Sequence, residues 1–175
     1  ITIKTLIIQK IFGFYKTAYW PMHHSSIVAG ASNILIGIGT APGLSPGCYI
    51  QGIGKIYIGD HTIIAPNVGI ISANHDLYDY RKHHKGCVKI GRYCWIGMNA
   101  VVMPDFELGD HTIVAAGAVV TDSFHEGYCV LAGNPAKRVK LLQKENCIEY
   151  SNPFEYYGYI PKENFASYRR KHLNL

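Results

Sequence analysis

Residues 90–120 read IGRYCWIGMNAVVMPDFELGDHTIVAAGAVV, and an aliphatic residue returns at every sixth position of this stretch. The repeating positions are Ile90, Ile96, Val102, Leu108, Val114 and Val120. The same spacing links Ile58, Ile64 and Ile70, and before them Ile38, Leu44, Ile50 and Ile56. A period of six is neither the helical period nor simple strand alternation. It is typical of a parallel β-helix, in which short strands turn corners at fixed intervals and successive turns stack on one core.

The six positions of each hexad have different requirements. The aliphatic residue at position one points into the core, where full burial contributes roughly 1.5–3 kcal/mol. Position five also faces inward and is small, so Cys48 and Cys94 are interpreted as core filler. Turn formers occupy positions three and four, because tight corners need unusual backbone angles. His61 and His111, each in a GDHT tetrapeptide, are therefore expected at outer corners, and the large Phe106 at position five predicts a bulge or an opened corner.

One segment fits no hexad. Residues from about 72 to 87, SANHDLYDYRKHHKGC, are polar and aromatic and contain no aliphatic repeat. The sequence predicts that this segment leaves the β-helix as an excursion loop. Long loops on a rigid scaffold commonly carry function.

Length and composition restrict the class of protein. The chain has 175 residues, a net charge of +5 and no basic stripe interleaved with aromatics, so a nucleic-acid partner is not expected. Five cysteines without framework spacing favour a reducing compartment, and the predicted location is cytoplasmic. The sequence contains no run of 18 apolar residues, so no membrane span is predicted.

Three regions are expected along the chain. Residues 1–26 form an N-terminal helical segment, residues 27–135 the β-helix, and residues 136–175 a C-terminal helix and tail. The first 20 residues would cap the first coil or pack on a partner subunit, or alternatively lie on a membrane surface. A helix is predicted over Ala136–Glu145, after Pro135. The Tyr-rich tail should wrap the body and end in a short helix after Pro161.

Several short motifs add to the hexads. They are NHD at 74–76, CWIG at 94–97 and AGNPAK at 132–137. With the hexads they resemble the hexapeptide-repeat acyltransferases over about residues 34–140, most of all the maltose, galactoside, xenobiotic and polysaccharide O-acetyltransferases. This resemblance implies a left-handed β-helix and acetyl-CoA as the acyl donor, with no metal. It also implies a homotrimer with active sites between subunits and a small-molecule acceptor.

The resemblance assigns the catalytic role to His75. A neutral imidazole can take the proton of an acceptor hydroxyl as that hydroxyl attacks the thioester, and histidine titrates near neutral pH. Acceptor contacts are expected from Asn74, Asp76, Tyr78 and Ser45. Ser45 and Ile53 stand where the sugar acetyltransferases place an Asn and an Asp, so the resemblance does not identify the acceptor. His83 and His84 could also reach it.

The resemblance also assigns residues to the donor. Trp95 would flank the pantetheine arm, and the small residues Ala115, Ala116 and Gly117 would let that arm approach the backbone closely. The remaining cofactor-binding candidates are Thr121, near the cofactor, and the basic cluster of Lys137, Arg138 and Lys140, near the nucleotide phosphates.

These observations predict an O-acetyltransferase that acts on a small acceptor such as a sugar or polysaccharide precursor, by direct transfer. A Cys94 acyl-enzyme is disfavoured because the hexad phase turns this thiol inward. The first alternative is a metalloenzyme similar to the γ-class carbonic anhydrases, although Asp79 stands where that family's second His is needed. The others are a serine or xenobiotic acetyltransferase and a non-catalytic binding module.

Overall fold

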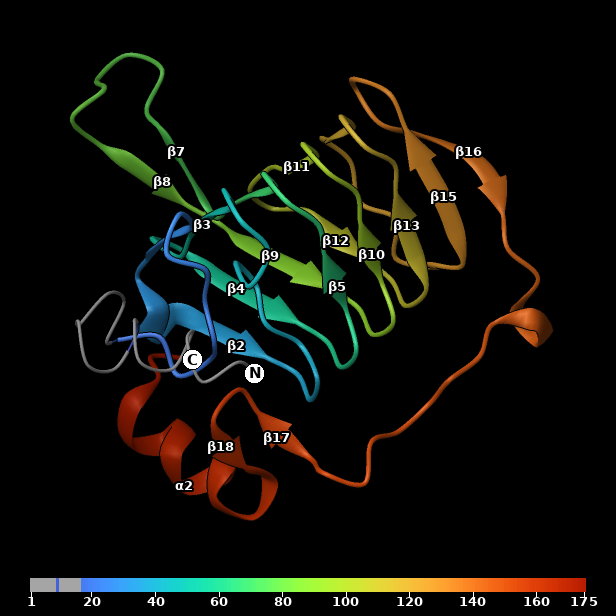
Figure 1. Cartoon of the computed structure of the whole chain (residues 1–175). Helices are drawn as coiled ribbons and strands as arrows, with labels where there is room; N and C mark the ends of the chain where they lie inside the picture. Colours follow the sequence, from blue (N-terminus) through green and yellow to red (C-terminus); the bar gives the residue numbers. More distant parts are fainter. Residues whose placement is uncertain (1–8, 10–16) are drawn as a thin grey trace.

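Short parallel strands dominate the architecture of the chain (Figure 1). A computed structural model describes residue 9 and residues 17–175, so most of the helix expected over the first 20 residues lies outside the described residues. Most of the strands form three sheets, here named A, B and C, whose pairings are parallel except at one end of sheet C. No helix in the described part of the chain is long and apolar enough to cross a membrane.

Each sheet collects strands from successive parts of the sequence. Sheet A contains, in spatial order, β1 (Ile27–Ala29), β3 (Tyr49–Gln51), β6 (Gly69–Ile71), β11 (Val101–Val102) and β14 (Val119–Val120). Sheet B contains β2 (Ile34–Ile36), β4 (Lys55–Ile58), β9 (Cys87–Ile90) and β12 (Glu107–Leu108), and the short 3-10 helix η2 (Ala31–Asn33) precedes it. Sheet C contains β5 (Ile63–Ile64), β10 (Trp95–Ile96), β13 (Thr112–Val114), β15 (Cys129–Ala132) and β16 (Lys137–Leu141).

The chain visits the three sheets in rotation, and we call one passage through A, B and C a circuit. Strands from successive circuits pair in register, so that Val101 lies between Gly69 and Val119 in sheet A, and Trp95 lies between Ile63 and Ile113 in sheet C. The prediction of short strands in parallel sheets is therefore confirmed.

The core consists of the repeating aliphatic residues. The position-one residues from Ile90 to Val120 are all buried, as are the position-five residues Cys94 and Ala100. Leu44 is an exception, because 45% of it is exposed and the inward position expected for it is wrong. It lies between β2 and β3, where the chain forms no strand. The turn formers Pro42, Gly43, Pro46 and Gly47 interrupt the extended backbone there, and the hexad phase is lost with it.

Position four of each hexad adopts the left-handed backbone conformation. The φ angle is 54° at His61 and Tyr93, 58° at Asn67, 59° at Asn99, 69° at Asp105, 53° at His111 and 71° at Gly117. The corner prediction is thus confirmed. The bulge or opened corner expected at Phe106 is wrong, because Asp105 keeps the left-handed corner, the Lys89 amide donates to the Phe106 carbonyl at 3.1 Å and β12 keeps its register with β9.

The helix predicted over Ala136–Glu145 is also wrong. Residues Lys137–Leu141 form β16, which pairs antiparallel with β15 at the end of sheet C, and only the 3-10 helix η3 (Lys144–Asn146) follows. The segment has good helix formers, but the last parallel strand presents a row of unpaired backbone groups that an added strand satisfies. Its lysines and arginine are typical of a strand at the exposed edge of a sheet.

The tail then returns along the outside of the sheets to β17 (Tyr156–Tyr157), β18 (Ile160–Pro161) and helix α2 (Lys162–His172) (Figure 1). Helix α2 begins directly after Pro161. Tyr93 donates from its hydroxyl to the Tyr150 carbonyl at 2.7 Å, and the Tyr159 amide donates to Tyr19 at 2.9 Å. The tail covers His111, which is buried at its corner rather than on an open edge.

We expect Ile96→Ala to lower the free energy of unfolding by about 2–5 kcal/mol, because Ile96 is fully buried and its truncation leaves a cavity. Urea unfolding at fixed protein concentration measures the effect. Ile148→Ala, at an exposed position of the tail, is the control and should change stability by less than about 0.5 kcal/mol. Equal stability of the two variants would show that position one does not face the core.

Candidate functional site

The segment that fits no hexad forms a β-hairpin rather than an irregular loop. β7 (Ala73–His75) and β8 (His83–Lys85) pair antiparallel, with His75 opposite His83 and Asn74 opposite His84. The hairpin leaves the body between β6 of sheet A and β9 of sheet B and projects from it (Figure 1). The Asp76 amide donates to the Lys82 carbonyl at 3.0 Å, which closes the turn. The hairpin therefore holds His75 on hydrogen-bonded backbone.

The tautomer of His75 follows from its contacts. Its Nδ1 lies 2.6 Å from the backbone carbonyl of Tyr80. A carbonyl oxygen only accepts hydrogen bonds, so Nδ1 carries the proton and donates. In the neutral ring Nε2 then holds the free lone pair. The ring of His83, the cross-strand partner of His75 on β8, lies 4.3 Å away between centroids and restricts rotation of the imidazole.

Asp76 makes its hydrogen bonds within the hairpin turn and to His84, and not to His75. Its Oδ1 accepts from the backbone amides of Tyr78 and Asp79, both at 2.8 Å, and its Oδ2 accepts from Nε2 of His84 at 2.6 Å. The hydrogen bond from His84, followed by the two backbone amides, lowers the pKa of this carboxyl from 3.8 to about 2. The pairing of His84 with Asp76 was not foreseen from the sequence, although the cross-strand register of a hairpin would place these side chains close together.

The other acceptor candidates differ in their surroundings. Tyr78 is 97% exposed at the hairpin tip and Asn74 is exposed on β7. Ser45 lies elsewhere, between β2 and β3, where its hydroxyl donates to the Ile64 carbonyl at 2.7 Å. The structure thus brings Asn74, His75, Asp76 and Tyr78 together in one hairpin and leaves Ser45 apart from them.

Several donor candidates share the outward face of sheet C. Trp95 is 52% exposed on β10, in the row that continues through Ile113 and Val130. The antiparallel pairing with β15 sets Lys140 opposite Val130 and Lys137 opposite Ala132, on the same outward face. Arg138 pairs with Leu131, whose side chain points inward, and a register shift between Val130 and Leu131 accompanies this change.

Two of these cations have acidic neighbours. Nζ of Lys137 lies 3.0 Å from Asp122, and Arg138 lies 3.5 Å from Glu126. All four side chains are largely exposed, so these ion pairs stabilise the fold by little and can exchange for a phosphate.

The small residues Ala115, Ala116 and Gly117 lie at the edge between sheets C and A. Gly117 has a φ of 71°, and a Cβ built on it would meet nothing within 4 Å. This edge is therefore open to the close approach of an extended amide-bearing chain. Thr121 follows β14 and is half-buried.

The hairpin and Trp95 occupy different sides of one chain. The hairpin leaves the body between sheets A and B, whereas Trp95 faces outward from sheet C. Burial raises the pKa of the Cys94 thiol to about 12, which is far from a reactive thiolate. Among the residues that the structure describes, no group of three or more His, Cys, Asp or Glu could hold a metal ion.

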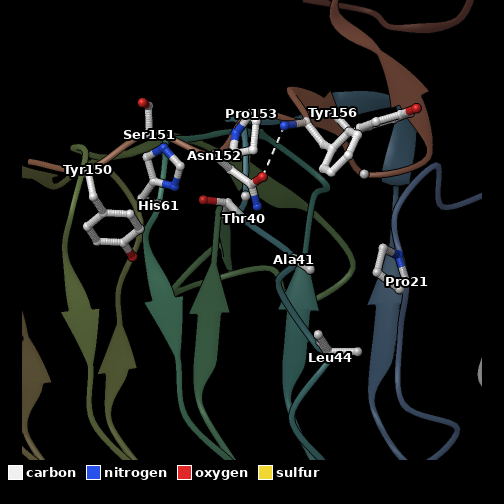
Figure 2. Close-up of a pocket in the computed structure, with 13 residues that line it drawn as sticks. Pro21, Thr40, Ala41, Leu44, His61, Tyr150, Ser151, Asn152, Pro153 and Tyr156 are labelled. Carbon is white, nitrogen blue, oxygen red and sulfur yellow. Dashed lines mark hydrogen bonds between the residues drawn. The ribbon is translucent and has the colours of Figure 1, made fainter. Parts of the chain in front are cut away.

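A pocket of about 650 Å³ lies away from the hairpin, between the corner residues Thr40 and His61 and tail residues 150–154 and 156 (Figure 2). No motif in the sequence predicts this pocket. The one available signal was the density of aromatic residues in the tail, since the pocket arises only when the tail returns to the first circuits.

Comparison with known proteins supports the motifs. The family model for bacterial transferase hexapeptide (six repeats) matches residues 87–122. The galactoside O-acetyltransferase of Escherichia coli K12 is 32% identical over 91 residues, which are 50% of this chain and 44% of that protein. The chain spans about half the length of the relatives that it matches.

Solved structures agree. A galactoside acetyltransferase in complex with coenzyme A is 26% identical, with a TM-score of 0.65 over 80% of this chain and 70% of that one. A maltose O-acetyltransferase from Clostridium difficile 630 is 28% identical, with a TM-score of 0.58 over 68% of this chain and 64% of that one. The resemblance to hexapeptide-repeat acetyltransferases is therefore confirmed.

We expect the hairpin turn to lose local stability in acid. A carboxyl whose folded pKa lies below its unfolded value stabilises the fold above the unfolded value and loses this contribution as the pH falls through the folded one. For Asp76 the window runs from 3.8 down to about 2. Hydrogen exchange of the Tyr78 and Asp79 amides, corrected for intrinsic rates, should stay constant from neutral pH to pH ~5 and accelerate below pH ~4.

Asp76→Asn is the matched control for this measurement. The amide oxygen can still accept from both backbone amides but does not titrate, so their corrected exchange should not change across the same window. Acid acceleration of equal size in both proteins would assign the effect to another group.

Proposed function

We propose that this protein transfers an acetyl group from acetyl-CoA to a hydroxyl of a small acceptor, with His75 as the general base. The observation that carries the proposal is the arrangement of His75 on the hairpin. Its Nδ1 donates to the Tyr80 carbonyl, and its Nε2 keeps a lone pair that can accept a proton. Its acetyltransferase relatives and the confirmed hexapeptide repeats support the choice of reaction.

The proposed chemistry is direct transfer. Nε2 of His75 accepts the proton of the acceptor hydroxyl as that oxygen attacks the thioester carbonyl, and the CoA thiolate leaves with the proton returned to it. The Nδ1–H···O=C hydrogen bond keeps the lone pair on Nε2 and stabilises the imidazolium while it carries the proton. A backbone amide would donate to the oxyanion.

The donor fits the outward face of sheet C. Trp95 offers an exposed aromatic surface to the thioester end of the pantetheine arm, and Lys140 stands three strands away, about 14 Å at ~4.8 Å per strand. Lys137 and Lys140 would contact phosphates, Arg138 would assist from the end of the sheet, and the open edge at Ala115, Ala116 and Gly117 would accommodate the arm. Thr121 would lie near the cofactor.

The outward faces of the sheets support a homotrimer with sites between subunits. The outward row of sheet A includes Ile27 and Tyr49, and that of sheet C includes Ile63 and Trp95, all large and substantially exposed. Sheet B instead carries charged outward residues, among them the pair Lys89 and Glu107 at 3.1 Å. Packing of sheet A of one copy on sheet C of the next is a heterologous contact that closes as a ring.

Such a ring would complete the site. The hairpin leaves the body after β6 of sheet A, so in the ring it would extend over sheet C of the neighbour, which carries Trp95. We therefore propose that His75 of one subunit acts on a donor held by the next. Asn74, Asp76 and Tyr78 would approach the acceptor from the hairpin, and Ser45 from the neighbour's first circuit.

The finer features of the proposal rest on the relatives. Left-handed winding of the circuits and a sugar or polysaccharide precursor as acceptor follow the hexapeptide-repeat acetyltransferases to which the chain is similar. The five free cysteines suit the reducing cytoplasm, which is the proposed location.

We expect His75→Ala to lower turnover by about 10²–10⁴-fold, because a general base contributes that much. Thermal stabilisation by CoA should persist, since the residue does not hold the donor. Release of free thiol from acetyl-CoA in the presence of a panel of neutral sugars measures turnover. The exposed His24 provides the control, and turnover of His75→Ala equal to that of His24→Ala would remove His75 from the mechanism.

Subunit mixing tests where the site lies. If His75 and Trp95 of one site come from different subunits, His75→Ala and Trp95→Ala co-assembled in equal amounts should recover roughly a quarter of wild-type turnover, since each mixed ring contains one intact site. No recovery would place both residues of a site on one chain.

We expect Lys137→Ala to weaken binding of CoA more than binding of dephospho-CoA, because a phosphate that loses its cation loses a charge-assisted contact. Calorimetric titration of both ligands measures the difference. Lys162→Ala, whose lysine pairs with Glu155 in the tail, is the control and should change neither affinity. Equal weakening of both ligands by Lys137→Ala would exclude contact with the 3′-phosphate.

A further inference from the structure

The pocket under the tail is a built feature of the fold. On one side of it the Tyr150 carbonyl accepts from the Tyr93 hydroxyl at 2.7 Å. On the other side the ring of Tyr157 stacks on Phe165 of α2 at 3.8 Å between centroids, and the Tyr159 amide donates to Tyr19. Residues 151–156 cross between these two anchors, and Asn152 Oδ1 accepts from the Phe154 amide at 3.0 Å to form a turn (Figure 2). The span is therefore held open over the first circuits.

The walls of this pocket are aromatic and uncharged. Phe154 is 74% exposed, and Tyr150, Tyr156 and Leu44 are also substantially exposed. Among the described residues that line the pocket there is no Asp, Glu, Lys or Arg, although charged residues make up 17% of the chain. Large apolar side chains gathered around a concave site of 300–1,000 Å³ are typical of small-molecule pockets.

A few polar groups stand among these walls. The His61 ring stacks on Tyr93 at 5.2 Å between centroids and lies tilted against Tyr150 at 4.8 Å, so two aromatic neighbours restrict its orientation. Within the described part of the chain neither ring nitrogen of His61 has a hydrogen-bond partner. Figure 2 shows His61 beside Thr40 and Asn152, with Tyr156 across the pocket from Tyr150.

We infer that this pocket binds a neutral sugar ring. A pyranose presents an apolar C–H face that packs on an aromatic ring, and a rim of hydroxyls that donate to and accept from groups such as His61, Asn152 and Ser151. The uncharged walls offer no partner to a phosphate or a carboxylate, and burying such a charge without a partner is costly. The pocket is therefore distinct from the basic cluster on β16.

Its position gives the sugar a role. Leu44 and Thr40 belong to the first circuit, next to Ser45, and tail residues 150–156 close the pocket above them. We infer that the bound ring is a non-reacting unit of the acceptor, and this assignment rests on the proposed function. The tail would then select acceptors by the sugar that it recognises.

The test is direct binding, independent of catalysis. Methyl glycosides of glucose and galactose, and maltose, are titrated against the full chain by saturation-transfer NMR and calorimetry, with glucose 6-phosphate and galacturonate as charged probes. We expect binding of at least one neutral probe and of neither charged probe. Phe154→Ala and Tyr156→Ala should raise its Kd about fivefold to tenfold, since each removes an aromatic contact.

One control and one further variant complete the test. Ile148→Ala truncates an exposed apolar residue of the same tail outside the pocket and should leave the Kd unchanged. His61→Asn keeps a residue that tolerates the left-handed corner and shortens the polar group, and it should weaken binding while the melting temperature is preserved. Absence of binding by every neutral probe, equal binding of the charged probes, or indifference to Phe154→Ala and Tyr156→Ala would each overturn the inference.

The same variants separate this inference from the proposed function. His75→Ala should bind the sugar normally, and Tyr156→Ala should raise KM for the sugar while KM for acetyl-CoA stays the same. Sugar binding without any acetyl transfer would leave the pocket standing and remove the enzyme. Transfer to a sugar with KM unaffected by Phe154→Ala and Tyr156→Ala would keep the enzyme and remove the pocket.

Discussion

Every circuit of this chain must pass through the same narrow cross-section, and the rest of the structure depends on that constraint. The interior accepts one aliphatic side chain per hexad and a small residue at position five, and each corner needs a left-handed backbone at position four. Strands that satisfy both conditions stack in register. Where the sequence does not satisfy them, at residues 38–48 and 72–87, the chain forms turns or leaves the stack. These two departures supply the pocket floor and the hairpin of the candidate site.

The constraint also explains what could be predicted. A period of six is a strong signal because a single misplaced residue interrupts the stack, so the inward phase from Ile90 to Val120 and the corners could be read from the sequence. Leu44 shared the spacing but not the backbone, because prolines and glycines beside it prevent a strand. The sequence predicted a helix in place of β16 for a different reason. Its conformation is set by the open edge of β15, a tertiary demand that overrides the helix propensity of Lys137–Leu141.

The candidate site was predictable to a similar depth. The place of His75 on a segment that leaves the stack could be predicted, because its motif lies in the long break of the hexads. Its tautomer could not, since this depends on the Tyr80 carbonyl that a hairpin brings back to the ring. Asp76 could be named as an acceptor candidate, but its hydrogen bond with His84 could not be predicted, because the cross-strand register of the hairpin decides that contact. The pocket depends on a contact between His61 and Tyr150, which are almost ninety positions apart. No local sequence pattern predicts such a contact.

Two edges of the body need the same left-handed backbone at position four but use different residues for it, and the difference gives each edge a different surface. Between sheets C and A, position four is Asn67, Asn99 and Gly117, which tolerate the left-handed conformation and leave the edge open. Between sheets B and C, the same position is His61, Tyr93, His111 and Tyr128, whose rings stack in one column at 4.9 to 5.2 Å. A tyrosine at positive φ is unfavourable by itself. Ring stacking along the column offsets that cost, and Tyr150 of the tail packs on two of its members, His61 and Tyr93. The aromatic edge therefore holds the tail. An edge that holds a tail over an uncharged pocket and an edge left open beside a basic strand are suited to two different ligands.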